Sequence, residues 1–495
     1  MKSFAAIAAV VVSLVSVSPS FAEPIRLSVA EAIRLAAERN LDVRAELYTP
    51  AQFEAEINRN RGIYDPALNL ELNYTDSIAP FPGIAGIVSS RGQSLQLNSS
   101  LSQFFPTGTI ATLGFDNSYN NSDSTANPRD FWQSNLGITL SQPLLKNFGR
   151  ENSELQINIS RFSKTASIEN FSTLLMNTVA RVRNEYFRLY SLREQLEVRK
   201  VSLELARKIL ADTRARVTAG VLPAMEILNA EFGVTSRERE LIETEKAVSD
   251  EVDTLRLLLQ IKGDDELLTI NLPRREPLQI DPEQAIKLAL NRPDIRAQKR
   301  NLDIVELQTR VLNNNIKPDL SVIASGFLSG FDNRYPRNLD RLGSFDYPGW
   351  SIGVNFSYPL GNNVARNDYR RSHLKSDQTR LQIRSLEETA INSVKAAIRG
   401  VNTNYKQIDV ADRGRAYAEE RLKAFIRRNE VGLATTRDVL DVENELATAK
   451  NNQIIALVNY DNAITQLLLA TGEILEKEGI RVVEEDADKL YSSIR

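Results

Sequence analysis

Two stretches of this chain lack proline over unusually long distances, and they restrict the possible folds more than any other feature. No proline lies between Pro143 and Pro223, and none follows Pro359. We therefore predict single helices over 149–218 and 362–430, each of about 70 residues. At about 1.5 Å per residue, each would be about 100 Å long. Rods of this length exceed the helices of ordinary globular domains.

Apolar residues line one side of each predicted rod. They recur every seven residues in the first rod and at alternating steps of three and four in the second. These coiled-coil seams comprise Leu175, Val182, Leu189, Leu196, Leu203, Leu210 and Val217, and then Ile391, Val394, Ile398, Val401, Tyr405 and Ile408. The remaining faces are mostly polar, so the expected partners are other helices or water. Asp412, Arg415 and Glu419 interrupt the second seam, either because they face a wet lumen or because the register drifts.

The chain reads as two copies of one unit. The segment 32–36 resembles 285–289, and a polar turn follows each. Further on, a glycine and the apolar and acidic residues after it match between 220–228 and 432–440. Both copies run helix, strands, very long helix, glycine turn and helix. This order indicates an old gene duplication, because the repeat is too long for a solenoid.

Short segments between these helices alternate between apolar and polar residues. We predict strands at about 67–76, 93–104, 109–118 and 132–141 in the first copy, and at about 319–329 and 350–359 in the second. Alternation over about ten residues is typical of transmembrane barrels, although a soluble sandwich gives the same pattern. The attached rods favour the barrel. Our hypothesis is six strands per chain, where a two-plus-two arrangement would give four, with long polar loops at 77–92 and 119–131.

The N-terminus predicts that the chain is secreted, and the number of strands predicts that it assembles with other copies. Lys2, an apolar run over 4–17 and the small-residue site ending at Ala22 predict a secretory signal peptide. No later run of 18 apolar residues predicts a transmembrane helix. Four or six strands cannot close a barrel, so several copies must surround one axis.

The composition excludes most catalytic and metal chemistry. The chain has no cysteine and one histidine, His373, which lies in a helical stretch rich in arginine and lysine. Thiol nucleophiles, disulfides and thiolate metal sites are therefore impossible, and no metal site or cofactor is expected. We predict that the chain is not an enzyme. The net charge of −3 gives no indication of nucleic-acid binding.

The combination of these features resembles the TolC-like outer-membrane efflux protein family over essentially the whole mature chain. The resemblance rests on the paired entry motifs at 32–43 and 285–295 and on the paired hairpin turns. The second turn, 430–433, and the following residues 438–441 are close to the sequence motif that is usual in this family. It implies a homotrimer with one shared barrel in the outer-membrane lipid of a Gram-negative bacterium and a helical barrel in the periplasm. It also implies a periplasmic adaptor (membrane fusion) protein and an inner-membrane pump or ABC exporter as partners.

The two glycine turns are candidate contact sites. Ordinary turn chemistry explains the glycines, but it does not explain apolar residues at an exposed end. By resemblance, these tips contact the adaptor through Gly220, Val221, Leu222, Val431, Gly432 and Leu433.

Acidic residues follow both tips. Asp438 and Asp441 lie one turn apart at the start of a helix, and Glu226 is the matching acid in the first copy. By resemblance, they form a cation ring at the periplasmic aperture. Thr435 and Asp438 also have the spacing of a capping box, which explains Asp438 without a channel role. Where some members of the family have an arginine and a gate tyrosine, this chain has Ala434 and Asn429.

We accordingly predict a mixed membrane β-barrel plus long α-helical coiled-coil barrel, built from internally duplicated helix–strands–helix hairpin protomers in a trimer. The expected segments are a signal peptide (1–22), a periplasmic helix (23–64), outer-membrane strands (65–148) and a long helical hairpin (149–272) of repeat 1, then the corresponding 273–317, 318–361 and 362–472 of repeat 2, and a C-terminal tail (473–495). The expected function is a passive exit duct of a tripartite efflux or type I secretion system. The alternative is a trimeric structural or adhesive stalk anchored by a β-barrel.

Overall fold

The computed structural model describes residues 24–83, 86–123, 130–482 and 484–494. The predicted signal peptide lies outside the described residues. The chain divides into two compact units, which are described separately. The first unit contains residues up to 41, 178–279 and 397–467, and the second contains 42–177, 280–396 and 468–495.

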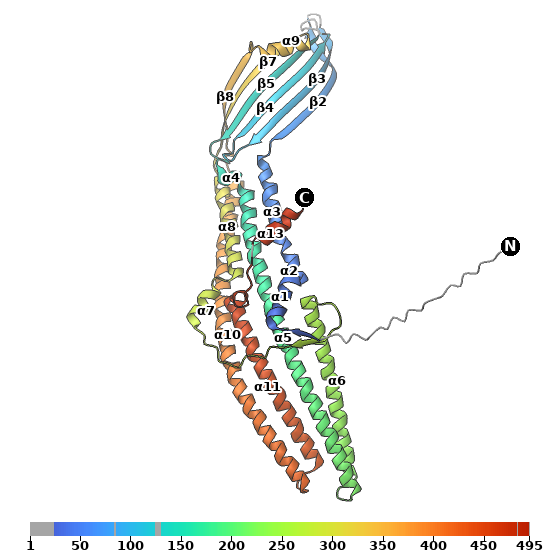
Figure 1. Cartoon of the computed structure of the whole chain (residues 1–495). Coiled ribbons are helices and arrows are strands. Elements are labelled where there is room, and N and C mark those ends of the chain that lie inside the picture. The colour runs from blue at the N-terminus through green and yellow to red at the C-terminus, as the bar shows by residue number, and fades with distance from the viewer. Residues whose placement is uncertain (1–23, 84–85, 124–129, 483, 495) are drawn as a thin grey trace, which may run out of the picture. The chain divides into compact units, whose positions relative to one another are not determined.

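The long rods of the prediction are present as helices (Figure 1). The two hairpins consist of α5 (Leu155–Thr218) with α6 (Met225–Leu259), and of α10 (Asn363–Glu430) with α11 (Thr436–Thr471). Along the first seam, Val182 and Leu189 are fully buried, and Val401 is nearly so in the second. The first rod differs from the prediction at its start, because a short helix α4 (Arg150–Ser153) precedes α5 and a break at Glu154 separates them.

A small core holds the first unit together around a connecting segment. Strand β1 (Ile25–Leu27) pairs in parallel with β6 (Leu267–Thr269), and α1 (Val29–Arg39) follows β1. Two buried tyrosines fix the segment after β6. The Ile270 and Asn271 backbone N–H groups donate to the Tyr186 hydroxyl over 2.9 and 3.0 Å, and the Tyr460 hydroxyl donates to the Glu276 carbonyl over 2.8 Å. Helix packing and backbone hydrogen bonds to side chains therefore both secure this connection.

The residues that interrupt the second seam form a polar layer within the first unit. Asp412 binds Arg275 over 2.9 Å, and it accepts a hydrogen bond from the Gln453 amide. Arg415 lies 2.8 Å from both Glu419 and Gln453. These contacts join α10 to α11 and to the segment after β6, so the charges are paired within the chain.

The second unit contains one antiparallel sheet of six strands (Figure 1). Its order is β2-β3-β4-β5-β7-β8, with the bounds Ala67–Gly83, Gly86–Phe104, Ile110–Ser122, Asp130–Pro143, Asp319–Asp332 and Pro348–Ser357. The prediction of a long polar loop over 77–92 is wrong. Strands β2 and β3 remain paired up to Gly83 and Gly86, so most of this segment is a two-stranded ribbon.

The two faces of this sheet differ in chemistry. Leu70, Leu136 and Val354 are exposed apolar residues on one face, and the polar residues between them point to the other. Within the described chain, β2 and β8 have no partner on their outer sides. The sheet is therefore open at both edges and exposes an apolar face, which is the state expected of a piece of barrel wall.

The second unit also contains several shorter helices. They are α2 (Leu41–Glu46), α3 (Tyr48–Arg61), the 3₁₀ turn η1 (Gly62–Tyr64), α7 (Pro282–Ala289), α8 (Pro293–Asn314), α9 (Tyr335–Gly343), α12 (Ile474–Lys477) and α13 (Glu484–Ser493). The segment predicted as one periplasmic helix over 23–64 is thus a strand followed by three helices and a 3₁₀ turn.

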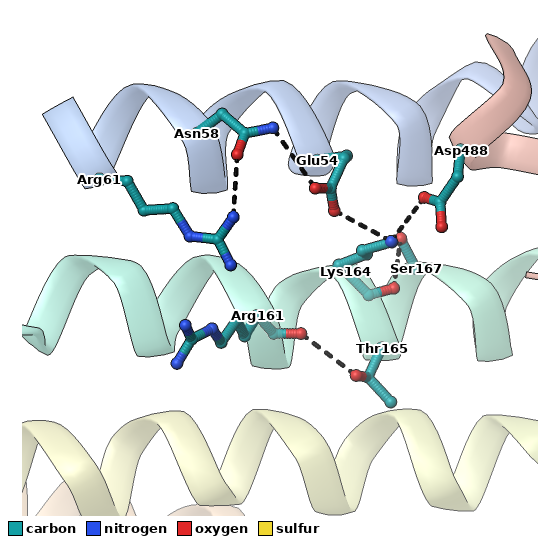
Figure 2. A network of polar contacts seen from close by, with 8 residues as sticks. All are labelled: Glu54, Asn58, Arg61, Arg161, Lys164, Thr165, Ser167 and Asp488. Carbon is teal, nitrogen blue, oxygen red and sulfur yellow. Dashed lines mark hydrogen bonds and ion pairs between the residues drawn. The ribbon is translucent and has the colours of Figure 1, made fainter. Parts of the chain in front are cut away.

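The C-terminal helix is tied to this unit by one buried lysine. Lys164 of α5 binds Glu54 of α3 over 3.0 Å and Asp488 of α13 over 2.6 Å (Figure 2). The side chain of Lys164 is 10% exposed, so its charge is nearly removed from water and depends on these two carboxylates.

One helix among the described residues, α11, is long and apolar enough to cross a membrane by length and composition alone. Half of its most apolar window is buried inside the protein. Tyr460, Asp461 and Thr465 of α11 are buried. These are properties of a core helix that packs against other helices.

Candidate functional site at the hairpin tips

Both hairpins of the first unit turn through a left-handed glycine. Gly220 has φ +72° and Gly432 has φ +79°, and a Cβ atom at either position would meet nothing within 4 Å. In both turns, the N–H of the residue after the glycine donates to the carbonyl of the residue five positions earlier. Val221 donates to the Arg216 carbonyl over 2.9 Å, and Leu433 donates to the Arg428 carbonyl over 2.8 Å. Glycine is favoured at such helix ends because it adopts a positive φ without strain. Space for a side chain is not what requires glycine here.

The tips expose apolar side chains in the described chain. Val221, Val431 and Leu433 are each 69% exposed. Leu222 is half-buried. The structure thus places five of the six predicted contact residues at an exposed surface. Such exposure of large apolar residues is unfavourable in water, and it is typical of a surface that binds a partner.

Asp438 forms the capping box that its spacing predicts. The Thr435 backbone N–H and hydroxyl each donate to the Asp438 carboxylate over 2.8 Å, and the Asp438 N–H donates to the Thr435 hydroxyl over 3.2 Å. These hydrogen bonds hold the pKa of Asp438 below its ordinary value. The carboxylate is therefore charged and fixed at the first turn of α11.

The other two acids have different surroundings. Asp441 is exposed, and its nearest basic group is Arg437, 3.8 Å away. Glu226 lies in the first turn of α6 and is half-buried, with one carboxylate oxygen that has no hydrogen-bond partner. Asp438 and Asp441 share the first turns of α11, whereas no contact joins either of them to Glu226 in the described chain. The single chain thus carries the acids near its tips without assembling a ring.

A buried ion pair joins the two hairpins behind the tips. Arg237 of α6 lies 2.9 Å from Glu443 of α11 and also donates to the Leu440 carbonyl over 2.9 Å. Ser202 of α5 donates to the other oxygen of Glu443. The Arg237 and Glu443 side chains are 10% and 5% exposed. Sequence reasoning missed this link, because arginine and glutamate on a helix are normally surface residues.

Close backbone approach and apolar packing accompany this ion pair. A Cβ atom at Gly233 of α6 would lie 2.8 Å from a methyl group of Leu440, so glycine lets the helices approach. Leu422, Val439 and Val442 form a buried cluster nearby. Arg216 donates to the Asn429 carbonyl over 3.0 Å. The Asn429 amide in turn donates to the Ala434 carbonyl over 2.9 Å, so Asn429 holds the second tip.

The described residues carry no group of three metal-ligating side chains. The single histidine, His373, is 54% exposed, and its Nδ1 lies 3.2 Å from Asp377 one helical turn away. This is the arrangement of a solvated helix residue.

Comparison with known proteins identifies the family. A family model described as outer membrane efflux protein matches residues 96–259 and 286–473. The outer membrane efflux protein BepC of Brucella suis is 22% identical over 372 residues, which cover 73% of this chain and 77% of BepC. The outer membrane protein TolC of Salmonella enteritidis is 23% identical over 383 residues, which cover 74% of each chain.

Solved structures agree in fold. The outer-membrane channel OprN superposes with a TM-score of 0.67 at 16% identity over 90% of both chains. The CmeC outer membrane channel of Campylobacter jejuni gives 0.66 at 16% identity, over 94% of this chain and 89% of CmeC. The matched segments include both helical hairpins and both glycine tips. This chain therefore belongs to the outer membrane efflux protein family and is an outer-membrane channel protein.

Proposed function

We propose that this chain is one of three identical protomers of an exit duct that conducts exported cargo passively through the periplasm and outer membrane. The partners would be a periplasmic adaptor and an inner-membrane pump or ABC exporter. The observation that carries the proposal is the sheet with six strands, two open edges and one apolar face. Unpaired backbone groups at such edges are not tolerated in lipid, so the edges must pair with other copies.

The number of strands determines the size of the barrel. Three protomers with six strands each would form a barrel of eighteen strands. Barrels of about 16–18 strands leave an aqueous channel. The polar face of the sheet would line this channel, and the apolar face would meet lipid.

The hairpin tips would be the adaptor contact. The support is the exposure of Val221, Val431 and Leu433 beside two left-handed glycine turns. Gly432→Asp should abolish export while trimers remain intact, because it places a charge in an apolar contact. Gly432→Ala is the matched control, since it adds at least as much left-handed strain, about 1 kcal/mol, without charge and should retain most export. Normal export by the aspartate variant would exclude the tip as a contact.

The acids near the tips would form the cation ring of the aperture. Three copies of Asp438, Asp441 and Glu226 around one axis would bring nine carboxylates together, and such crowded charges attract cations. Because Asp438 also caps α11, Asp441 is the cleaner test.

Single-channel conductance with a divalent cation on the periplasmic side tests this ring. Asp441→Asn should weaken divalent block, and Asp438→Ala with Asp441→Ala should abolish it. Asp253→Asn, an exposed acid on α6 away from the tip, should leave the block unchanged. Equal block of the wild type and the double variant would refute the ring.

A further inference from the structure

The connection between β7 and β8 folds into the helix α9, which lies against the sheet (Figure 1). Asn338 of α9 is fully buried and donates to the Ser134 hydroxyl of β5 over 2.6 Å. Ser134 in turn donates to Asn117 of β4 over 2.7 Å. A Cβ atom at Gly330 of β7 would clash with the backbone of Asn338. The helix is therefore held tightly to three strands and is not a loose loop.

The alternation of the strands determines which face α9 covers. Ser134 points to the same side of β5 as Leu136, Ile138 and Leu140, which are exposed apolar residues. The helix thus lies on the apolar face. The chain leaves β5 at Pro143 and continues into α4. The helix α9 lies at the opposite end of the sheet. In an outer-membrane protein whose long helices are periplasmic, this is the external rim of the lipid-facing surface.

The helix has two unlike flanks. Asn338 and Leu342 face the sheet and are buried. At about 100° per residue, the arginines lie along one flank, and Tyr335 and Leu339 lie along the other. The arginines of this flank are Arg334, Arg337 and Arg341, and all three are exposed.

Contacts with β5 and β7 show where each flank of α9 meets the sheet. Arg341 binds Asp332 over 3.0 Å, and Asp332 lies two residues beyond Gly330 toward the rim. The basic flank therefore reaches the rim of the sheet. The Tyr335 ring packs on Trp132 with centroids 4.7 Å apart, and its hydroxyl accepts from Asn117 over 3.4 Å. Trp132 pairs directly with Asp332 across β5 and β7, so both flanks contact the rim of the apolar face.

We propose that α9 lies in the external lipid–water interface and that its basic flank binds the phosphate groups of outer-leaflet lipids. A short helix on the rim of an apolar face, with exposed arginines on one flank and an aromatic contact on the other, has the pattern of an interfacial helix. Tyr119, which packs on Trp132 with centroids 4.9 Å apart, extends the aromatic cluster expected at this depth.

The charges around the helix decide which arginines are available. Asp332 already pairs with Arg341, whereas Arg334 and Arg337 have no ion pair among the described residues. The acids Asp340 and Asp346 are also exposed. On the helix, Asp340 lies about 160° from Asn338 and about 60° from Arg337, but no ion pair joins it to Arg337 in the described chain. Arg334 and Arg337 are therefore the phosphate ligands, and guanidinium groups bind phosphate oxygens in a bidentate manner.

Native mass spectrometry of the purified full-length trimer tests this inference. The probe is lipid A, a bisphosphorylated glycolipid, compared with the same lipid after dephosphorylation. Arg334→Gln with Arg337→Gln should reduce bound lipid A by at least about tenfold, since each basic residue near an anionic surface adds about 1 kcal/mol. Dephosphorylated lipid should bind weakly and equally to the wild type and the variant.

Two controls test the specificity of lipid A binding. Arg366→Gln with Arg371→Gln removes two exposed arginines from α10 and should leave lipid A binding unchanged. Inorganic phosphate at high concentration should not displace lipid A, which would distinguish a lipid site from a free-phosphate site. Unchanged lipid A binding by the Arg334 and Arg337 variant, or equal wild-type binding of both lipids, would overturn the proposal. Neither outcome depends on export activity.

Discussion

The buried ion pair between Arg237 and Glu443 gives the sharpest prediction, because it joins α6 of one hairpin to α11 of the other. Arg237→Met keeps most of the side-chain volume but removes the partner that lies 2.9 Å from Glu443. The carboxylate then keeps only Ser202 as a partner in a site where it is 5% exposed. A buried charge that loses its partner costs about 3–5 kcal/mol.

This magnitude converts directly into an opening equilibrium. If α11 must separate from α6 when the periplasmic end opens, the variant favours the separated state by about 10²- to 10⁴-fold. Arg237→Met with Glu443→Met removes both charges and should recover most of the loss, since apolar replacement of a whole buried pair is often neutral. Single-channel conductance should therefore rise in the single variant and return toward the wild-type value in the double variant.

An exposed pair on the same hairpin provides the control. Arg207 and Glu238 lie 2.8 Å apart with side chains 60% and 44% exposed. Arg207→Gln should change conductance little, because such surface pairs contribute about 0–1 kcal/mol. Hydrogen exchange of the α11 amides provides a second measurement. If Arg237→Met changes neither conductance nor exchange, the ion pair does not hold the hairpins together and the reasoning is wrong.

Two further predictions concern buried charges elsewhere. Burial, and then the neighbouring Glu185, raises the pKa of Glu251 to about 7 from 4.5. The folded protein thus holds this proton more tightly than the unfolded chain, so stability should fall by about 3 kcal/mol as pH rises from about 4.5 to above 7. Glu251→Gln should remove that slope in guanidinium unfolding followed by circular dichroism, and an unchanged slope would contradict the assignment. Lys164→Met should release α13, because Glu54 and Asp488 lose their shared cation (Figure 2). Faster hydrogen exchange confined to α13 is expected, and unchanged exchange would show that other contacts hold it.

The sequence predicted the features that depend on long regular patterns. The absence of proline and the apolar seams located the rods, and α10 ends at Glu430 as predicted. The same reasoning did not find the break at Glu154, because it depends on the left-handed Gly149 and on the ion pair of Arg150 with Glu154. Local geometry of this kind leaves no periodic signal.

The strands and the polar contacts show the same limit. Six strands were predicted near their observed positions, but the ribbon over 77–92 was missed because it extends beyond the regularly alternating segment of β2. The helix α9 lies in a gap between two predicted strands. Arg237 and Glu443 are about 200 positions apart in the sequence, and Arg275 and Asp412 are about 140 positions apart. A single sequence carries no pattern for such distant partners.

The proposed duct requires the open edges of the sheet to pair between copies and form a closed ring. The chain has no cysteine, so introduced pairs report this directly. Within one chain, β2 and β8 are separated by five strand spacings, about 24 Å, which no disulfide spans. Leu70→Cys should be combined in turn with Ile352→Cys, Val354→Cys and Phe356→Cys.

Non-reducing electrophoresis of these double variants after oxidation is the decisive measurement. We expect covalent trimers for at least one pairing, reversed by reductant and absent from the Leu70→Cys single variant. Monomers alone at all three positions would contradict a ring closed by β2 and β8.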